Sequence, residues 1–171
     1  MTDQASPTST PPTTTATAFR TMMSRFPSGV SVVTALLPDG TPRGMTCSSL
    51  CSVSLEPPVL LVCLRHGSPT LDAVTGSGRL AVNLLHDRAR PVAELFASGD
   101  PHRFERVPWA TEGVAGPHLT RDAHTVADCE VALSQRVGDH TAVYGRISRI
   151  TRQTDHVPLL YGLRRFHRWP R

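Results

Sequence analysis

Lysine is absent from this chain of 171 residues: all 18 basic residues are arginines, and with 14 acidic residues they give a formal net charge of +4. Without a lysine amine the chain cannot form a Schiff base with a carbonyl substrate or a pyridoxal cofactor. It also cannot supply the lysine of a phosphate-binding P-loop. Phosphate binding itself is not excluded, because the forked guanidinium of arginine suits phosphate oxygens.

Aromatic residues and long apolar runs are also scarce. Aromatics make up 5% of the chain, and the arginines are spread along it apart from "RRFHR" near the C-terminus. A nucleic-acid footprint clusters basic residues with interleaved aromatics, so nucleic-acid binding is not expected. No apolar run approaches the roughly 18 residues that cross a bilayer, and the N-terminus lacks the pattern of a secretory signal. We therefore expect a cytoplasmic protein that does not bind membranes.

Several catalytic and metal motifs are missing. The chain contains no G-x-G-x-x-G after a strand, no G-x-x-x-x-G-K-[ST] and no G-x-S-x-G. Cys47 and Cys51 form a C-x3-C spacing without a second pair, which disfavours a zinc site. Cytosolic cysteines are usually reduced, so core packing is the preferred interpretation for Cys51, Cys63 and Cys129. A nucleophilic cysteine stays open, because the sequence does not show whether a base lies nearby.

What the chain does contain begins with a tail of threonine, serine and proline. This composition cannot bury enough apolar surface to order itself, so residues 1–16 are predicted to be disordered and 17–171 to form one domain. In "TAFRTMMSRF" the apolar residues recur at helical spacing, which predicts an amphipathic helix facing a core. "SPTLDAVTGSG" and "RARPVAELFAS" predict two more short helices.

The remaining segments are typical of strands. "PDGT" joins two β-rich runs as a hairpin, and "PPVLLVCLR" and "RLAVNLL" predict buried strands, the first covered on both faces. Two long segments in which apolar and polar residues alternate predict strands that meet at the tight turn "GDH". "VPLLYGLRRFHRW" predicts a final short strand. We expect seven or eight strands in a mainly β (α+β) fold. Because regular helices do not separate the strands, an antiparallel barrel is favoured over a doubly wound parallel sheet.

A run of hydroxyl residues follows the first hairpin. Between Thr46 and Ser54 there are five hydroxyl side chains within nine residues, and Gly44 before them would allow close approach to the backbone. A solvated edge strand explains this composition, and a cradle for a phosphate or a polar ring is the alternative. His140 in "GDH" lies at a turn from which a side chain can reach a ligand, although it could equally be a plain turn residue.

The order of these segments resembles a known family. "FPSGVSVVTA", "GMTCSSLCSVSLEPPVLLVCL", "SPTLDAV", "LAVNLL", "ELFAS", "RFERVPW", "GDHTAVYGRI" and "PLLYGLRRFHRW" occur in the order found in short-chain flavin reductases of two-component monooxygenases. The resemblance spans about Phe19 to Trp169. It implies a six-stranded, antiparallel Greek-key split barrel of the FMN-binding type, usually a homodimer with flavin near the subunit interface.

The resemblance also implies a set of site residues. Flavin ring and phosphate contacts are expected from Thr46, Cys47, Ser48, Ser49, Ser52, Val53, Ser54, Ser68, Thr70, Asn83, Arg103 and Phe104. His140 is expected to face the nicotinamide, and Tyr161 and Arg164 to close over the reduced pyridine nucleotide. No metal is expected.

The implied activity is reduction of FMN, or FAD, by hydride transfer from NADH, or NADPH. The reduced flavin would pass to a partner flavin-dependent monooxygenase of aromatic or secondary metabolism. Two alternatives stay open: a split-barrel flavoprotein that keeps FMN bound and reduces another acceptor, and a flavin-binding module without catalysis.

Overall fold

A computed structural model of the chain describes residues 14–111 and 115–169. The predicted disordered tail falls mainly outside these ranges. Within them, Thr15 caps the first helix, α1 (Ala16–Ser24), because its side-chain oxygen accepts the N–H of Ala18. No helix in these two ranges is long and apolar enough to span a bilayer.

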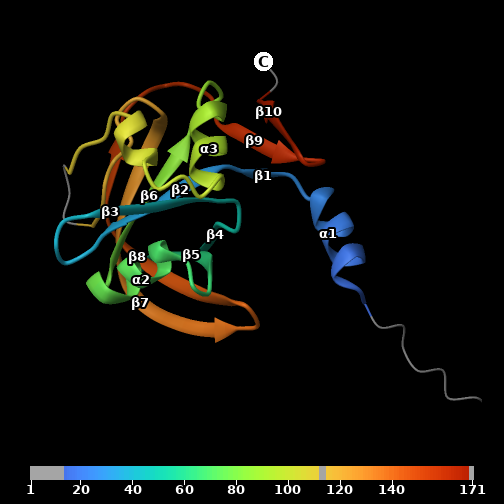
Figure 1. Ribbon diagram of the computed structural model, residues 1–171, viewed down its shortest axis with the longest axis horizontal. Coiled ribbons are helices and arrows are strands. Elements are labelled where there is room, and N and C mark those ends of the chain that lie inside the picture. The colour runs from blue at the N-terminus through green and yellow to red at the C-terminus, as the bar shows by residue number, and fades with distance from the viewer. Residues whose placement is uncertain (1–13, 112–114, 170–171) are drawn as a thin grey trace, which may run out of the picture.

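The main sheet has seven strands in the order β3-β2-β6-β7-β8-β5-β4, with every neighbouring pair antiparallel (Figure 1). Their bounds are β2 (Ser31–Leu36), β3 (Pro42–Cys47), β4 (Cys51–Leu55), β5 (Pro58–Arg65), β6 (Arg79–Leu85), β7 (Ala123–Val137) and β8 (His140–Arg152). The sheet curls until the chain after β3 meets β5, where Ser49 Oγ accepts the N–H of Cys63 and donates to its carbonyl, both at 3.1 Å. The expected antiparallel β fold is confirmed, with seven strands in this sheet in place of six.

A second, three-stranded sheet lies beside the first. It contains β1 (Ser28–Gly29), β9 (Leu159–Gly162) and β10 (Arg165–Arg168) in the order β1-β9-β10. The prediction of one final strand was wrong, because the chain turns back between β9 and β10. Leu163 and Arg164 form this turn with positive φ values of 50° and 60°. Neither residue type signals such a turn, which usually carries Asn-Gly.

Two helices pack on the main sheet as their sequences predict. In α2 (Pro69–Ser77), Ser68 caps the N-terminus and Gly78 ends the helix in the left-handed conformation. Residues of α2 pack into one buried cluster, whereas α3 (Arg90–Ala97) packs into a second. Strand β2 is buried on both faces: Val33 belongs to the first cluster and Val32 to the second.

Strand β5 departs from its prediction. Leu60, Val62 and Leu64 are buried, whereas the residues between them are partly exposed. The strand is therefore covered fully on one face only, and its continuous apolar run does not distinguish this from burial on two faces.

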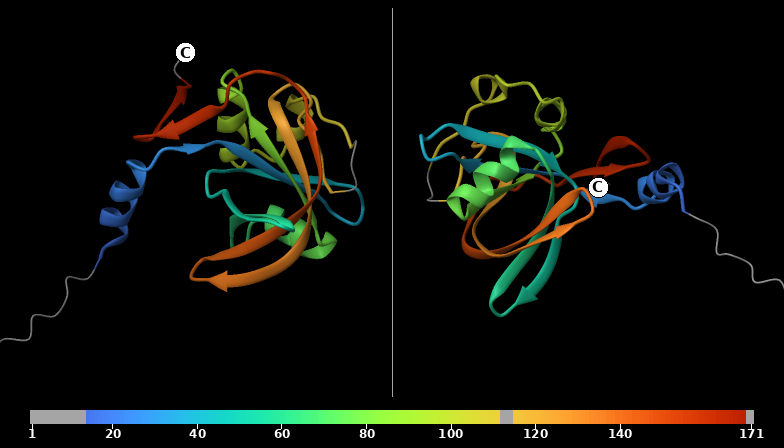
Figure 2. Two further views of the ribbon diagram at one scale, coloured as in Figure 1. Left: turned by 180° about the vertical axis from the view of Figure 1, so that it is seen from behind. Right: turned by 60° about the horizontal axis from the view of Figure 1, so that its bottom comes forward.

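Helix α1 forms where predicted but does not face a core. Every residue of α1 is at least partly exposed, and Phe19, Met22 and Phe26 are 54%, 59% and 68% exposed. Figures 1 and 2 show α1 standing clear of the main sheet in all three views. Helical periodicity identified the apolar face, and it carries no information about which surface covers that face.

Candidate functional site

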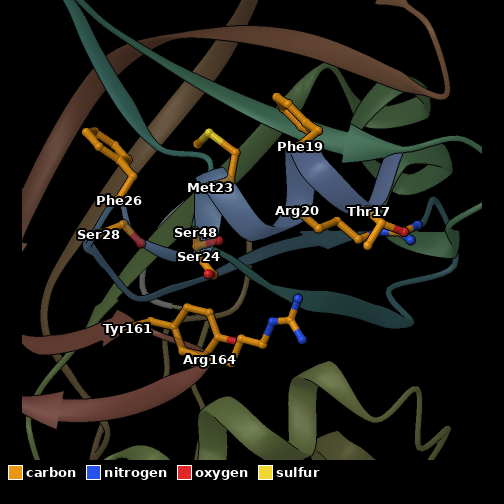
Figure 3. Close-up of a pocket in the computed structure, with 10 residues that line it drawn as sticks. All are labelled: Thr17, Phe19, Arg20, Met23, Ser24, Phe26, Ser28, Ser48, Tyr161 and Arg164. Atoms are coloured by element: carbon orange, nitrogen blue, oxygen red, sulfur yellow. The ribbon is translucent and has the colours of Figure 1, made fainter. Parts of the chain in front are cut away.

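Two cavities open on either side of the β9–β10 hairpin and share Ser48, Tyr161 and Arg164 in their walls. The first, here called the α1 cavity, lies between α1 and the hairpin and has a volume of about 610 Å³ (Figure 3). The second, the α3 cavity, lies between α3 and the hairpin and has a volume of about 500 Å³. Both volumes lie in the range of small-molecule and cofactor sites.

The hairpin is held in place from both sides. Tyr161 pairs with Ser28 across β1 and β9, and its ring packs at 5.1 Å from the ring of Phe166. At the turn, the N–H of Leu163 donates to the carbonyl of Ser24 at 2.6 Å, which ties the hairpin to the end of α1. Arg164 follows directly, so the turn fixes the backbone from which its side chain enters the cavities.

The two cavities together are here called the cleft. The side chains at its centre have donors and acceptors that form no hydrogen bond within the described chain. Within the described part of the chain, the Ser48 hydroxyl, the Tyr161 hydroxyl and the guanidinium groups of Arg20 and Arg164 make no hydrogen bond or ion pair. Glu94, in the wall of the α3 cavity, is paired with Arg90 at 2.8 Å. The cleft thus offers hydroxyl and cationic donors beside apolar and aromatic surface.

The predicted hydroxyl cradle divides into parts with different roles. Thr46 and Ser48 line the α3 cavity, although the Thr46 hydroxyl already donates to the carbonyl of Ala93 at 2.6 Å. Ser49 is occupied in closing the barrel on Cys63. Cys47 is buried, and burial raises the pKa of its thiol although the contact with Ser49 opposes this. Ser48 is therefore the hydroxyl of this group that is free to bind a ligand in the cleft.

The next predicted residues lie on the edge strand β4. Ser52 and Val53 are exposed and Ser54 is partly exposed, with a register shift against β5 between Ser52 and Ser54. They line neither cavity. Their exposure leaves them accessible to a ligand or to another chain.

A second group of predicted residues gathers at the far end of β5. His140 begins β8 opposite Arg65, two residues beyond Cys63, and its Nδ1 lies 2.8 Å from Asp139 Oδ1. Ser68 comes three residues after Arg65, and its hydroxyl accepts the N–H of Leu71 at the start of α2. Thr70 on α2 is buried, and none of these predicted residues lines either cavity.

Three of the predicted residues are internal or partly internal. Asn83 has no exposed surface, and its amide bonds to β2, to Pro117 and to the N–H of Leu119. Phe104 is buried with its ring 5.1 Å from that of Phe96. Arg103 donates to the carbonyl of Gly44 at 2.9 Å, and burial lowers its pKa despite the opposing charge of Asp100.

Gly44 was expected to let a ligand come close to the backbone, but in the structure its small size serves packing. A Cβ at this position would lie 3.0 Å from Phe96 and 3.1 Å from Phe104. The space above this glycine is thus filled by the two aromatic rings, and small size here lets α3 and the Arg103 segment pack on β3.

Sequence reasoning missed the contribution of α1. Thr17, Arg20 and Ser24 line the α1 cavity together with Phe19 and other apolar residues of the helix. The spacing of three and four between these polar residues places them on one stripe beside the apolar face. That stripe was visible in the sequence, but the prediction for this segment rested on its apolar face alone.

Asp128 belongs to a polar cluster that lies inside the fold. Its carboxylate bonds to His118 Nε2 and to Arg149 Nε, each at 2.9 Å, and both Asp128 and His118 are buried. Since the opposite charge of Arg149 and the imidazole satisfy the carboxylate, this cluster has a structural role in joining β7, β8 and the segment before β7.

Comparison with known proteins agrees with this architecture. The flavin reductase like domain matches residues 23–170. The chain is 51% identical to a flavin reductase (NADPH) of Lentzea aerocolonigenes, covering 91% of each chain, and 40% identical to a flavin reductase (NADH) of Kitasatospora aureofaciens, covering 89% of this chain and 81% of that one. The solved styrene monooxygenase flavin reductase of Pseudomonas putida superposes with a TM-score of 0.80 at 29% identity, over 89% of this chain and 97% of that one.

These matches span nearly the whole folded chain and carry the same split-barrel architecture. They agree with the antiparallel sheet, the short helices and the order of segments described above. The chain therefore belongs to the flavin reductase-like family, and this membership places it among the oxidoreductases.

Proposed function

We propose that the chain reduces FMN, or FAD, by hydride transfer from NADH, or NADPH, and releases the reduced flavin to a partner flavin-dependent monooxygenase of aromatic or secondary metabolism. The observation that carries the proposal is the cleft beside the β9–β10 hairpin, where Ser48, Tyr161 and Arg164 present unpaired donors. Relatives named as flavin reductases, one of them a monooxygenase reductase, support it.

The chemistry requires little acid or base catalysis from the protein. The nicotinamide C4–H bond would break as its hydride adds to flavin N5, which oxidises one nucleotide and leaves one reduced flavin as its anion without uptake of a proton. Such a transfer depends mainly on holding the two rings face to face. Arginine and backbone donors near the flavin pyrimidine would stabilise the anionic reduced ring.

A steady-state survey tests the proposal directly. NADH and NADPH oxidation is measured with FMN, FAD and riboflavin in turn, and turnover that depends on added flavin is the expected result. Protein that stays yellow through gel filtration and turns over free flavin poorly would instead indicate a bound prosthetic flavin. Bound flavin without any nucleotide oxidation would indicate a binding module.

Ser48 and Ser49 give a matched pair for locating the flavin. Ser48→Ala removes a free hydroxyl from the cleft and is expected to weaken flavin binding without loss of stability. Ser49→Ala removes both bonds to Cys63, and we expect it to lower the unfolding free energy by about 1–3 kcal/mol. A flavin titration unaltered by Ser48→Ala would remove this hydroxyl from the site.

His140 is proposed to position the nicotinamide from the end of β8. His140→Ala is then expected to raise the KM for NADH and slow hydride transfer while flavin affinity stays close to that of the wild type. The side chain is partly exposed, and its one hydrogen bond within the described chain is to Asp139, so its loss should cost little stability. Unchanged turnover in this variant would exclude the role.

A homodimer is proposed on the basis of α1. Exposed Phe19 and Met22 of α1, with exposed Phe26 just after it, form an apolar surface that the single chain leaves uncovered, and such surfaces mark interfaces. Met22→Glu is a suitable probe because Met22 lines neither cavity. Sedimentation should show dimeric wild type and a shift of Met22→Glu toward monomer, with Arg25→Gln, at the residue that caps α1, as the control. A monomeric wild type would refute the proposal.

A further inference from the structure

The charge inside the α1 cavity is of one sign. Arg20 and Arg164 line it, and none of its lining residues is Asp or Glu. Neither guanidinium has an ion-pair partner within the described part of the chain, whereas nearby Arg90 is paired with Glu94. Figure 3 shows Phe26 at one side of the cavity, the guanidinium of Arg20 at the opposite side and that of Arg164 between them.

The turn that carries Arg164 is strained. Leu163 and Arg164 have φ values of 50° and 60°, a region that costs an ordinary L-residue about 1 kcal/mol or more. An Asn-Gly turn would remove this cost, but it would also remove the guanidinium from the cleft. The bond from Leu163 N–H to the Ser24 carbonyl holds this strained turn against α1, the helix that supplies Arg20.

A phosphomonoester dianion fits such a site. Two guanidinium groups offer several forked donors to phosphate oxygens, and the Thr17 hydroxyl lies on the same side of the cavity as Arg20 (Figure 3). Sites for the unphosphorylated nucleotide often use an acidic side chain to bind the ribose 2′-hydroxyl, and an acid there would repel a 2′-phosphate. The α1 cavity has two arginines among its lining residues and no acid.

Building on the proposed function, we infer that Arg20 and Arg164 bind the 2′-phosphate of NADPH, so that the chain uses NADPH in preference to NADH. Phe19 and Tyr161 also line the cavity and supply aromatic surface on which an adenine ring can stack. The phosphate of FMN has the same chemistry, and the test distinguishes these two sources of phosphate.

The decisive measurement is the ratio of kcat/KM for NADPH to that for NADH, with riboflavin as acceptor because riboflavin carries no phosphate. We expect a ratio above one in the wild type and a fall of about tenfold or more in Arg164→Gln and in Arg20→Gln. Arg164→Lys, which keeps the charge but not the fork, should recover part of the loss. Arg165→Gln and Arg25→Gln are the neighbouring controls and should leave the ratio unchanged.

A binding measurement gives a readout independent of turnover. In calorimetry with the full chain, 2′,5′-ADP should bind more tightly than 5′-AMP, and Arg164→Gln should abolish the difference. A ratio unchanged in both glutamine variants would overturn the inference while nucleotide oxidation upholds the proposed function. A selective loss of the advantage of FMN over riboflavin, with NADH as donor, would assign the arginines to the flavin phosphate and also overturn it. Absence of oxidation of either nucleotide with any flavin would refute the proposed function itself.

Discussion

Replacing Asn83 by alanine should separate an internal role from a ligand contact. The Asn83 Oδ1 accepts the N–H of Leu119 at 2.8 Å, and Nδ2 donates to the Val32 carbonyl, the Thr34 hydroxyl and the Pro117 carbonyl at 3.1–3.3 Å. Asn83→Ala leaves the buried Leu119 N–H without a partner and removes the donor shared by the three acceptors.

The magnitude follows from these lost bonds. Each buried polar group left unpaired costs about 1–3 kcal/mol, and Pro117 keeps the bond from Thr34 at 2.6 Å, so the total should be about 3 kcal/mol. For a chain of this length, 1 kcal/mol moves the melting temperature by roughly 2–4 °C. We therefore expect Asn83→Ala to melt about 6–12 °C below the wild type, with an unchanged flavin KM well below that temperature.

Asn83→Asp adds a dependence on pH. The introduced carboxyl would be buried and would face carbonyl acceptors, so its pKa in the folded state would rise above the unfolded value of about 4. A raised folded pKa means that the charged form is disfavoured, and stability is lost as pH rises through that pKa. The deficit in unfolding free energy relative to the wild type should widen between pH 5 and pH 8. A melting temperature within 2 °C of the wild type in Asn83→Ala, together with a raised flavin KM, would refute the internal role.

Three further perturbations probe packing, thiols and the hairpin turn. Gly116→Ala places a Cβ 2.7 Å from the Thr34 carbonyl oxygen and should cost about 1–3 kcal/mol in chemical denaturation; wild-type stability would contradict this close contact. Labelling of the native protein with a thiol reagent should modify exposed Cys51 quickly and leave Cys129 unmodified, since burial raises its pKa to about 12; equal rates would contradict this. Leu163→Asn should stabilise the fold by about 0.5–1 kcal/mol by relieving the positive φ, and a lower melting temperature would contradict the strain.

The parts of the fold that the sequence predicted well are those with local chemical signals. "PDGT" marks the β2–β3 turn because Gly40 adopts a positive φ and Asp39 accepts the N–H of Thr41. Ser68 and Gly78 mark the ends of α2 for similar reasons. The β9–β10 turn was missed because Leu163 and Arg164 carry no such signal, and tertiary contacts hold the turn where propensity does not.

The candidate site was predicted only in part, because residue type does not reveal which polar atoms the fold has already used. Ser48 and Ser49 are chemically identical neighbours, yet one is free in the cleft and the other closes the barrel. Asn83 is polar, as residues that contact a ligand often are, yet it is fully buried like a core residue. Arg20 was overlooked because the sequence does not show that the β9–β10 hairpin, distant along the chain, lies beside α1.

The position of strand β2 between the two buried clusters determines how the molecule unfolds. Because its alternate side chains enter both buried clusters, neither cluster can separate from the sheet without disrupting the other, and the two should unfold as a single cooperative unit. The backbone amides of β2 should then exchange with solvent deuterium only when the whole chain unfolds. Helix α1 contributes no buried residue to this unit, so we expect it to move relative to the barrel while both clusters stay intact.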